Sequence, residues 1–320
     1  MKGLMFIKPG QAELTNDPMP AVMPDTMLVR TLYSGLSNGT ERSFLVGGNY
    51  GAGQPWPKRL AYQHVSRVVE CGSQISRYQV GDVVFSSTFP GHVAYHVLRE
   101  SDLVVRLPEG MDPISATMLG VASVSFHDAR RARITVSDRV LVLGDGLIGI
   151  FASQAARAMG AHVVLAGHHI DRLRVAHACG TDVVIDNSTN AGDEEVIQNG
   201  PYTAIFECSG GDVMDWIIGV PGKPGLIGRR SHVRLVMVAG RYDVSYNFNM
   251  AGNAEVDIIH TQHFDQSDLE NVVRLVTRGT IALKPVIRDV VPIDEAVDIF
   301  DTLRDNPRKL PGTVFSFPED

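Results

Sequence analysis

The chain has 320 residues, of which 44% are hydrophobic and 20% are charged, and its formal net charge is −7. This composition is typical of a globular protein with a full core, the length predicts two domains, and the negative charge without a basic stripe argues against nucleic acid or an acidic membrane as partner. The three isolated cysteines, an N-terminus without a secretory signal pattern and the lack of any apolar run near ~18 residues predict a cytosolic protein with no disulfide framework and no cysteine-rich zinc lobe.

Residues 1–110 read as short strands separated by turn residues. Strands are expected in 27–36, 64–72 and 80–85, and a further β-rich stretch runs through 93–108. The first strand leads into a segment rich in Ser, Asn and Gly, which we interpret as a loop. Many short strands at close spacing predict a small β-barrel or sandwich.

The rhythm changes near residue 111, where strands begin to alternate with helices. A helix is predicted in 112–132, with Pro113 near its first turn. Strands are then expected in 140–143, 162–167, 182–186, 202–210 and 234–240, and helices in 148–160, 171–180 and 213–220. This alternation predicts βαβ units and a parallel sheet. An amphipathic helix in 292–306 and a closing strand in 312–317 follow, while the polar stretch 186–200 predicts a surface loop with a short helix.

The main chemical motif is Gly144-Asp145-Gly146-Leu147-Ile148-Gly149, a G-x-G-x-x-G string between an apolar strand and an alanine-rich helix. That context predicts a dinucleotide site, and the alternative is an ordinary strand–turn–helix connection. Gly144 permits the tight turn, Gly146 lets the backbone approach a pyrophosphate, and Gly149 lets the helix pack closely. The free N–H groups at the helix N-terminus then face the phosphates.

The strand in 162–167 bears on the choice of cofactor. An NAD site usually places Asp or Glu about 20 residues after the motif begins, to hold the ribose 2′-hydroxyl. Here the strand runs into Gly167, His168 and His169, and 147–169 contains no acidic residue. His168, His169 and Arg172 could donate to a 2′-phosphate, although solvated loop histidines are the alternative. We therefore predict NADP, with NAD as the alternative.

The strings VGDVV, LVLGDGLIG and the ending GTVF, in this order of domains, resemble the medium-chain dehydrogenase/reductase superfamily, which contains zinc alcohol dehydrogenases and quinone oxidoreductases. The resemblance implies an α/β protein made of a GroES-like β-barrel catalytic domain, residues 1–110 and 284–320, and a Rossmann domain with a doubly wound parallel sheet, residues 111–283. It also implies an active site in the cleft between them. SGLSNGTER (34–42) and LAYQHVSRVVECG (60–72) are similar to the bacteriochlorophyllide dehydrogenase-like subgroup, from which we transfer no substrate.

The sequence departs from the zinc members of that superfamily at all three ligand positions. Asn38 stands where those members carry Cys, Tyr62 in the string AYQ replaces the His of Gly-His-Glu, and the third position falls near Gly120. Asn, Tyr and Gly do not supply the thiolate, imidazole or carboxylate that zinc needs. His64 and Glu41 lie nearby in sequence, but two residues do not make a closed site. We therefore expect no catalytic zinc.

Without zinc, a substrate carbonyl must be polarised by a hydrogen-bond donor. By resemblance, Thr40 matches the hydroxyl residue that links substrate oxygen to the nicotinamide ribose, and Tyr62 occupies the place of a lost ligand. We predict Tyr62 as donor or acid, Thr40 as relay and His64 as support. The alternative is that Tyr62 only fills the vacated volume. His92 and His96 could line the cleft or face solvent.

The cofactor prediction takes positions from both domains. It comprises Asn38, Gly144, Gly146, Leu147, Ile148, Gly149, Gly167, His168, His169, Arg172, Cys208, Ala239, Gly240 and Gln262. Cys208 is expected at the cofactor edge rather than as a nucleophile, because no base is evident beside it. His260 and His263 flank Gln262 at a strand end, where relatives approach the nicotinamide. His127 is expected to be a packed helix residue.

Three functions remain open from the sequence. The first is a zinc-independent alcohol dehydrogenase or ketone reductase that uses NADP(H) and a small-molecule substrate. The second is a reductase of quinones or activated C=C bonds, and the third is a non-catalytic nucleotide-binding or redox-sensing protein, since a glycine motif argues for binding but not for turnover. The resemblance and the strand-like segment VSYNFN (244–249) further predict a homodimer formed through the Rossmann sheets.

Overall fold

The computed structural model describes residues 1–306 and 311–318 and divides into two compact units. Unit 1 comprises Met1–Gly120, Asp265–Thr277 and Val286–Asp320, and unit 2 comprises Val121–Phe264 and Arg278–Pro285. Helix α9 (Gln266–Thr277) therefore groups with unit 1, whereas the sequence prediction placed it in the Rossmann domain. Each unit carries its own sheet.

Unit 2 contains a six-stranded sheet in which every neighbouring pair is parallel. Its strands are β8 (Arg139–Leu143), β9 (His162–Gly167), β10 (Val183–Asp186), β11 (Ala204–Glu207), β14 (Arg234–Met237) and β15 (Asp257–His260). The spatial order β10-β9-β8-β11-β14-β15 corresponds to 3-2-1-4-5-6, the doubly wound order of dinucleotide-binding domains. The predicted Rossmann sheet is confirmed.

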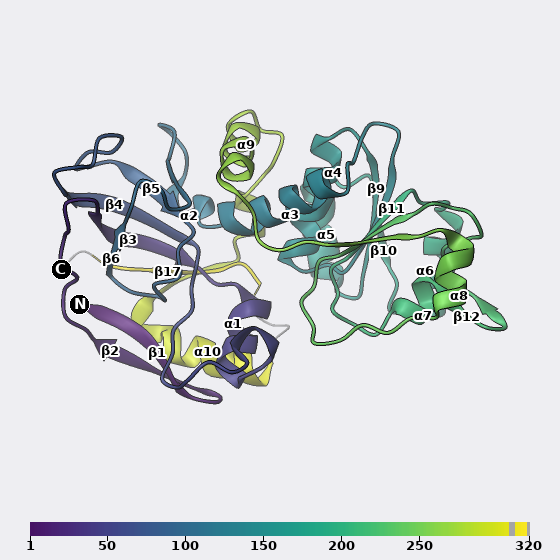
Figure 1. The fold of residues 1–320 in the computed structure, drawn as a ribbon, viewed down its shortest axis with the longest axis horizontal. Helices are drawn as coiled ribbons and strands as arrows, with labels where there is room; N and C mark the ends of the chain where they lie inside the picture. The colour runs from purple at the N-terminus through teal and green to yellow at the C-terminus, as the bar shows by residue number, and fades with distance from the viewer. Residues whose placement is uncertain (307–310, 319–320) are drawn as a thin grey trace. The chain divides into compact units, whose positions relative to one another are not determined.

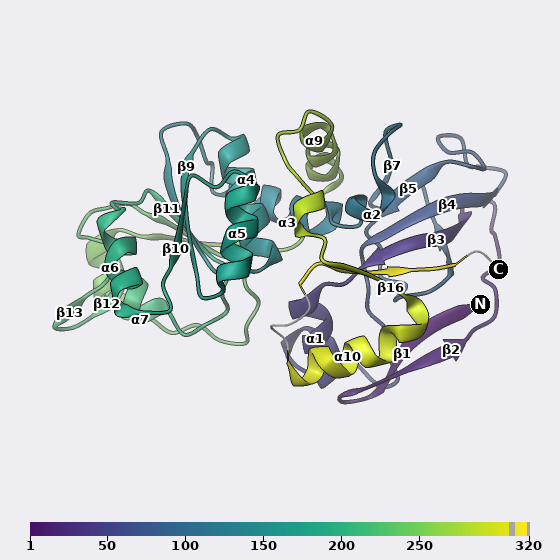
Figure 2. The same cartoon turned by 180° about the vertical axis from the view of Figure 1, so that it is seen from behind.

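Helices cover both sides of this sheet, with α4 and α5 on one side and α6 and α7 on the other (Figure 1, Figure 2). The helices of this part of the chain are α3 (Leu119–Arg131), α4 (Leu147–Ala158), α5 (Ile170–Ala178), α6 (Asn190–Gln198), α7 (Met214–Ile217) and α8 (Phe248–Ala254), with a short ribbon of β12 (Gly219–Val220) and β13 (Lys223–Pro224). Because both faces are covered, strands such as β11 are buried along their whole length.

Unit 1 contains a seven-stranded sheet whose pairs are antiparallel except for β16 and β17. Its strands are β3 (Met27–Gly35), β4 (His64–Cys71), β5 (Val83–Ser86), β6 (Tyr95–Leu98), β7 (Val104–Arg106), β16 (Asp289–Pro292) and β17 (Thr313–Ser316), and β1 (Lys2–Lys8) and β2 (Gln11–Asn16) form a separate hairpin. β17 is the predicted closing strand, and it pairs with β3 from the N-terminal half.

The described part of unit 1 contains four helices, of which α1 and α10 share a core with the hairpin and β17. They are α1 (Asn38–Val46), α2 (Pro113–Ala116), α9 and α10 (Ala296–Asp305), with 3₁₀ turns at Asn49–Gly51, Lys284–Val286 and Ile293–Glu295. Phe300 of α10 lies edge-on to Phe6, with ring centroids 5.1 Å apart, and stacks on Phe315 at 6.1 Å. These contacts tie the C-terminal helix to the N-terminal strands.

Two predicted elements of unit 1 take a different form. The Ser/Asn/Gly segment after β3 is helix α1 rather than a loop, because the Glu41 carboxylate accepts the free Ser37 N–H at 2.8 Å and so supports the first turn. The single helix predicted in 112–132 is broken into α2 and α3. At the break the Thr117 hydroxyl donates to the Ile114 carbonyl at 2.6 Å and ends the shorter helix.

The strand-like segment in 244–249 is not a strand. Asn247 instead caps α8, where its side-chain oxygen accepts the Met250 N–H at 3.0 Å. The sequence alternation misled the prediction because Tyr246 and Phe248 are exposed and pair with no neighbouring strand in the described chain. The strand at this edge of the sheet is β15.

No helix in residues 1–306 and 311–318 combines the length and the apolar character required to cross a membrane.

Candidate functional site

The Tyr62 phenol is the centre of a small buried cluster in unit 1. Tyr62 precedes β4, is 7% exposed, and its hydroxyl lies 2.9 Å from the Ser37 hydroxyl. Thr40 adds a hydrogen bond to the same phenol. Burial raises the pKa of Tyr62 to about 12, the Ser37 hydrogen bond opposes that rise, and the charge of Glu41 adds to it. The phenol is therefore a neutral hydrogen-bond donor at physiological pH.

Helix α1 supplies the polar partners of this phenol from its first turn. Ser37 occupies the N-cap position, but its hydroxyl makes no capping bond and reaches Tyr62 instead. Asn38, the first residue of α1, has a buried side-chain amide with no hydrogen-bond partner in the described part of the chain. A buried amide without an internal partner is costly, so it is suited to a ligand that completes its hydrogen bonds. Asn38 and Thr40, both predicted from the sequence, thus lie in the first turn of α1, and Thr40 contacts Tyr62 there.

Three buried histidines of unit 1, His64, His92 and His96, lie close to one another. His64, at the start of β4, has its Nε2 atom 3.0 Å from the Gly91 carbonyl oxygen, and its ring lies 5.0 Å from that of His96. Burial is the largest cause that lowers the pKa of His64 well below its usual value, and burial lowers that of His96 to about 3. Their rings are therefore neutral, and the support of Tyr62 by His64 stays a prediction, since the hydrogen bond of His64 is to Gly91.

Glu41 connects the histidines to α1. One carboxylate oxygen accepts the Ser37 N–H at 2.8 Å, and the other lies 2.7 Å from the His92 Nε2 atom. Both Glu41 and His92 side chains are fully buried, so His92 does not face solvent. Sequence reasoning missed Ser37 and His92 as parts of this network, and it considered Glu41 only as a reserve metal ligand. No local pattern signals this network, because Glu41 lies four residues after Ser37 rather than at the three-residue spacing of a capping box, and His92 is 51 residues from Glu41.

The residues at the three superfamily ligand positions do not fit zinc. Asn38 offers an amide and Tyr62 a phenol, neither of which belongs to the thiolate, imidazole and carboxylate set that zinc prefers. At Gly120, an added Cβ would lie 3.1 Å from the Gln63 Oε1 atom, so the Gln63 side chain already fills the space of a third ligand. Glu41 is committed to Ser37 and His92.

The glycine loop of unit 2 connects β8 to α4 and fits a dinucleotide. Gly144 has a φ of 112°, which L side chains rarely adopt, and an added Cβ there would lie 2.9 Å from the Cys208 carbonyl carbon. An added Cβ on Gly149 would overlap the Gly144 carbonyl, whereas one on Gly146 would meet no atom within 4 Å. The loop is thus closed on its inner side and open at Gly146, where α4 begins without a side-chain cap.

The end of β9 carries a carboxylate that the sequence prediction did not expect there. The Asp145 side chain, from the glycine loop, accepts the His169 N–H at 2.7 Å, lies 3.0 Å from the His169 Nδ1 atom and pairs with Arg172 at 3.4 Å. His168 is exposed, and Gly167 is buried beside Asp145. The NADP prediction considered only residues 147–169 and did not consider this carboxylate, which comes from a residue outside the strand.

The remaining predicted cofactor residues lie after the carboxyl ends of neighbouring strands. Cys208 follows β11 beside Gly144, and burial raises the pKa of its thiol well above the usual value, so it is no thiolate nucleophile. Ala239 and Gly240 follow β14, and Gln262 follows β15 and is exposed. In parallel sheets, ligands bind outside this end of the strands. Leu147 and Ile148 open α4.

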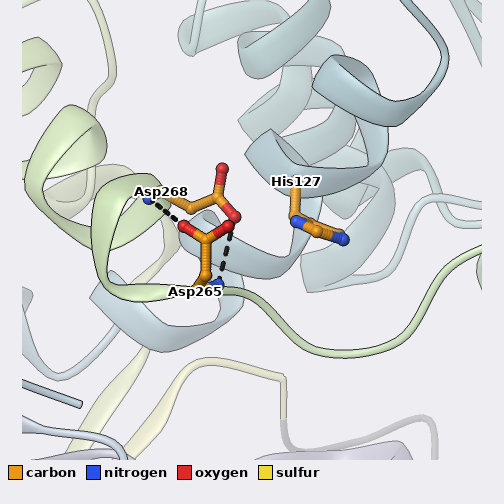
Figure 3. Close-up of side chains that lie close together, drawn as sticks. All are labelled: His127, Asp265 and Asp268. Atoms are coloured by element: carbon orange, nitrogen blue, oxygen red, sulfur yellow. Dashed lines mark hydrogen bonds between the residues drawn. The ribbon is translucent and has the colours of Figure 1, made fainter.

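The other histidines of the sequence analysis take no part in these clusters. His260 ends β15 and is exposed, and burial lowers the pKa of His263, which follows it. His127 lies on α3, where its Nδ1 atom accepts a hydrogen bond from Arg130 at 3.1 Å. Figure 3 draws His127 with Asp265 and Asp268, whose carboxylates each accept the other's N–H, at 3.1 and 2.9 Å, across the start of α9. This reciprocal capping accounts for the acidic pair.

Comparisons with known proteins agree with the fold. Residues 148–278 match the family model described as "Zinc-binding dehydrogenase". Sorbitol dehydrogenase of Ovis aries is 24% identical over 331 residues, which cover 92% of this chain and 90% of that protein. D-arabitol-phosphate dehydrogenase of Enterococcus avium is 21% identical and covers 100% of this chain and 99% of its own length.

Solved structures share the whole architecture. Galactitol-1-phosphate dehydrogenase from Escherichia coli superimposes with a TM-score of 0.84 at 18% identity, and the match covers 99% of this chain and 100% of that one. The family model and these relatives support an oxidoreductase of the alcohol dehydrogenase type, as the superfamily resemblance implied, while the solved structures show the fold. The zinc of the family name contrasts with the Asn38, Tyr62 and Gly120 positions of this chain.

Proposed function

We propose that this protein catalyses zinc-independent hydride transfer between a nicotinamide dinucleotide and a small carbonyl or alcohol substrate. The observation that carries the proposal is the Tyr62 phenol, a neutral donor held by Ser37 and Thr40 at the position of a lost metal ligand. The relatives act on polyols or polyol phosphates by name, so hydroxy-ketones and their alcohols are the first substrates to consider.

The dinucleotide would be held by the glycine loop and by the strand ends around it. Gly146 leaves room for the pyrophosphate, and the N–H groups of Leu147 and Ile148 at the start of α4 would bind its charge. Gly144 and Gly149 keep the loop in the shape that this needs. When bound, the dinucleotide supplies or accepts the hydride, and the protein's own task is to orient the substrate and to manage one proton.

Tyr62 would manage that proton. Its hydroxyl can donate to the substrate carbonyl oxygen, stabilise the negative charge that develops there and then transfer its proton. Ser37 and Thr40 would hold the phenol in place, with Thr40 as the relay for a replacement proton. The Asn38 amide, which lacks an internal partner in the described chain, would bind the cofactor or the substrate next to them.

The raised pKa of Tyr62 favours the reductive direction. A phenol with a pKa of about 12 is protonated throughout the physiological range, so it is ready as an acid but a poor base. Alkoxides are about as basic as hydroxide, whose conjugate acid has a pKa of ~15.7, so the proton transfer to product is downhill. We therefore propose ketone reduction as the faster reaction at neutral pH.

Two other functions are separated from this one by a single assay. Reduction of quinones or activated C=C bonds needs no strong acid at a carbonyl oxygen, and a redox-sensing protein needs no turnover at all. The purified protein is offered NADH and NADPH with a panel of hydroxy-ketones, simple ketones, enones and quinones, and cofactor oxidation is followed by absorbance. Ketone turnover supports the proposal, turnover of enones or quinones alone selects the second function, and cofactor binding without turnover selects the third.

We also propose a homodimer. The predicted strand in 244–249 does not carry this proposal, but β15 lies at the edge of the parallel sheet in unit 2, and an edge strand offers unpaired backbone groups for pairing with a second chain. Light scattering at micromolar concentration measures the mass directly. A dimer is expected, and a monomer contradicts the proposal.

A further inference from the structure

At the end of β9, the side chain of Asp145 lies where a side chain at position 167 would otherwise lie. NAD sites usually carry an acidic residue at the end of this strand, and Gly167 ends β9 here. An added Cβ on Gly167 would lie 2.5 Å from the Asp145 Oδ2 atom and 2.6 Å from its Cγ atom. The carboxyl group of Asp145 thus occupies the space into which a side chain at 167 would extend. The strand end has not lost a carboxylate but receives it from the glycine loop.

We propose that Asp145 is the cofactor-specificity residue of this protein: it holds the adenosine ribose by its hydroxyls and makes the protein prefer NAD(H) to NADP(H). The inference rests on the proposed binding of a dinucleotide and adds the choice between the two. A carboxylate accepts hydrogen bonds from a free 2′-hydroxyl, whereas a 2′-phosphate brings about −1.5 to −2 charges and only acceptor oxygens.

The surrounding charges strengthen this choice. His169 and Arg172, the residues that would bind a phosphate, are both paired with Asp145, whose side chain is only 6% exposed. Asp186, which lies opposite Gly167 in the β9–β10 register, adds a second carboxylate, and its pKa is lowered mainly by hydrogen bonds from Ser188 and further by the charges of His168 and His169. A phosphate would therefore have to displace the ion pair between Arg172 and Asp145, because the Arg172 guanidinium is already paired with that carboxylate.

A purely structural role for Asp145 predicts something different. Its carboxylate accepts the N–H of His169, the N-cap residue of α5, so its loss also weakens the start of that helix. Such weakening would lower the affinity for both cofactors alike. A role in specificity instead changes the ratio of the two affinities, and the ratio is the quantity to measure.

In the experiment, NADH and NADPH are titrated into the wild type, Asp145→Asn, Asp182→Asn and a double variant of the full chain. Calorimetry and nicotinamide fluorescence measure the two dissociation constants of each form. The wild type should bind NADH at least ~10-fold more tightly, equal to ~1.4 kcal/mol. Asp145→Asn keeps the size and removes the charge, and it should reduce that ratio by about tenfold or more. Asp182→Asn is the matched control, because Asp182 pairs with Arg157 and accepts the Val163 N–H near the other end of the same strand. The control should keep the wild-type ratio.

A relocated carboxylate keeps the test decisive if Asp145→Asn folds poorly. The double variant D145G/G167D removes the side chain that fills the space at 167 and places an Asp at the usual position, so it should restore the wild-type ratio within roughly threefold. Tighter NADPH binding by the wild type, or an unchanged ratio in Asp145→Asn, overturns the proposal and returns the loop to the NADP prediction. Binding of neither dinucleotide by the wild type overturns the proposed function itself, and this outcome is distinct because no affinity ratio can then be measured.

Discussion

The two polar clusters of this molecule are built on opposite principles. The cluster around Asp145 in unit 2 pairs a carboxylate with the His169 ring and the Arg172 guanidinium, whose side chains are 33% and 18% exposed. The cluster around Tyr62 in unit 1 is buried and consists of neutral hydroxyl groups. The Glu41 carboxylate accepts the Ser37 N–H next to them. One cluster is suited to distinguish charges and the other to donate a hydrogen bond.

The difference corresponds to the two tasks that we propose for the clusters, cofactor selection and proton transfer. A charged cluster at the surface discriminates between ligands that differ by a phosphate, because charge acts over several ångströms. A carbonyl oxygen acquires charge only during the reaction, so its partner must be neutral, desolvated and in place beforehand. The Asp145 cluster should therefore control cofactor affinity, and the Tyr62 cluster should control turnover.

The largest effect is expected for Tyr62→Phe, which keeps the ring and removes only the hydroxyl. If the phenol is the acid, kcat should fall by ~10²–10⁴-fold while the cofactor Kd stays nearly unchanged. Tyr202→Phe is the matched control, because burial raises the pKa of that phenol to about 12 as well, and its hydroxyl donates to the Val196 carbonyl in unit 2. Unaltered turnover in Tyr62→Phe would return Tyr62 to a space-filling role and favour the C=C or quinone reductase.

The glycine loop offers a pair of variants with opposite outcomes. Gly146→Ala meets no protein atom, so the fold should be kept while the methyl group blocks the pyrophosphate and weakens dinucleotide binding by about tenfold or more. Gly149→Ala collides with the Gly144 carbonyl and should cost about 1–3 kcal/mol of stability. Calorimetric titration and urea unfolding measure the two effects. Wild-type affinity in Gly146→Ala would show that the pyrophosphate lies elsewhere.

Unit 1 should lose stability in acid because of its buried histidines. The pKa of His96 is about 3 in the folded chain and ordinarily about 6.5, so below pH 6.5 the unfolded chain binds the proton first. Stability is thus complete above pH 6.5 and falls as the pH drops toward 3, by ~1.4 kcal/mol per pH unit for each such histidine. Urea unfolding at pH 7 and pH 4.5 should show a smaller acid loss in His96→Gln than in the exposed control His177→Gln. Equal losses would contradict the neutral, buried state of His96.

The smallest effect is expected for Ser37→Ala. The Ser37 hydrogen bond lowers the pKa of Tyr62, so its removal should raise that pKa further and make the phenol a weaker acid. Thr40 still holds the phenol, and kcat should fall by less than about tenfold. Steady-state kinetics compare the variant with wild type. A loss as large as that of Tyr62→Phe would contradict a merely supporting role for Ser37.

The parts of this molecule that local sequence determines could be predicted. The strands of the parallel sheet are short apolar runs between turn residues, and the glycine loop lies in one continuous string from β8 to α4. The exchange of zinc ligands for Asn38, Tyr62 and Gly120 stays a prediction, which depends on the positions that the resemblance defines.

The clusters themselves could not be predicted, because their members are distant in the chain. Ser37 and Tyr62 are 25 residues apart, and Glu41 and His92 are 51 apart. Asp145 was visible inside the glycine motif, but its contact with His169, 24 residues on, depends on the way β8 and β9 lie side by side. The search for a carboxylate along the strand alone therefore missed it.

The central claim is that a phenol takes the place of the catalytic metal, and one measurement tests it directly. Zinc content and ketone turnover are determined on the same sample, before and after prolonged treatment with a chelator. The account predicts far less than one equivalent of zinc and an unchanged kcat, since Asn38, Tyr62 and Gly120 offer no suitable ligand. One tightly held equivalent of zinc, with turnover lost on its removal, would contradict the account and direct attention to His64 and Glu41 as ligands.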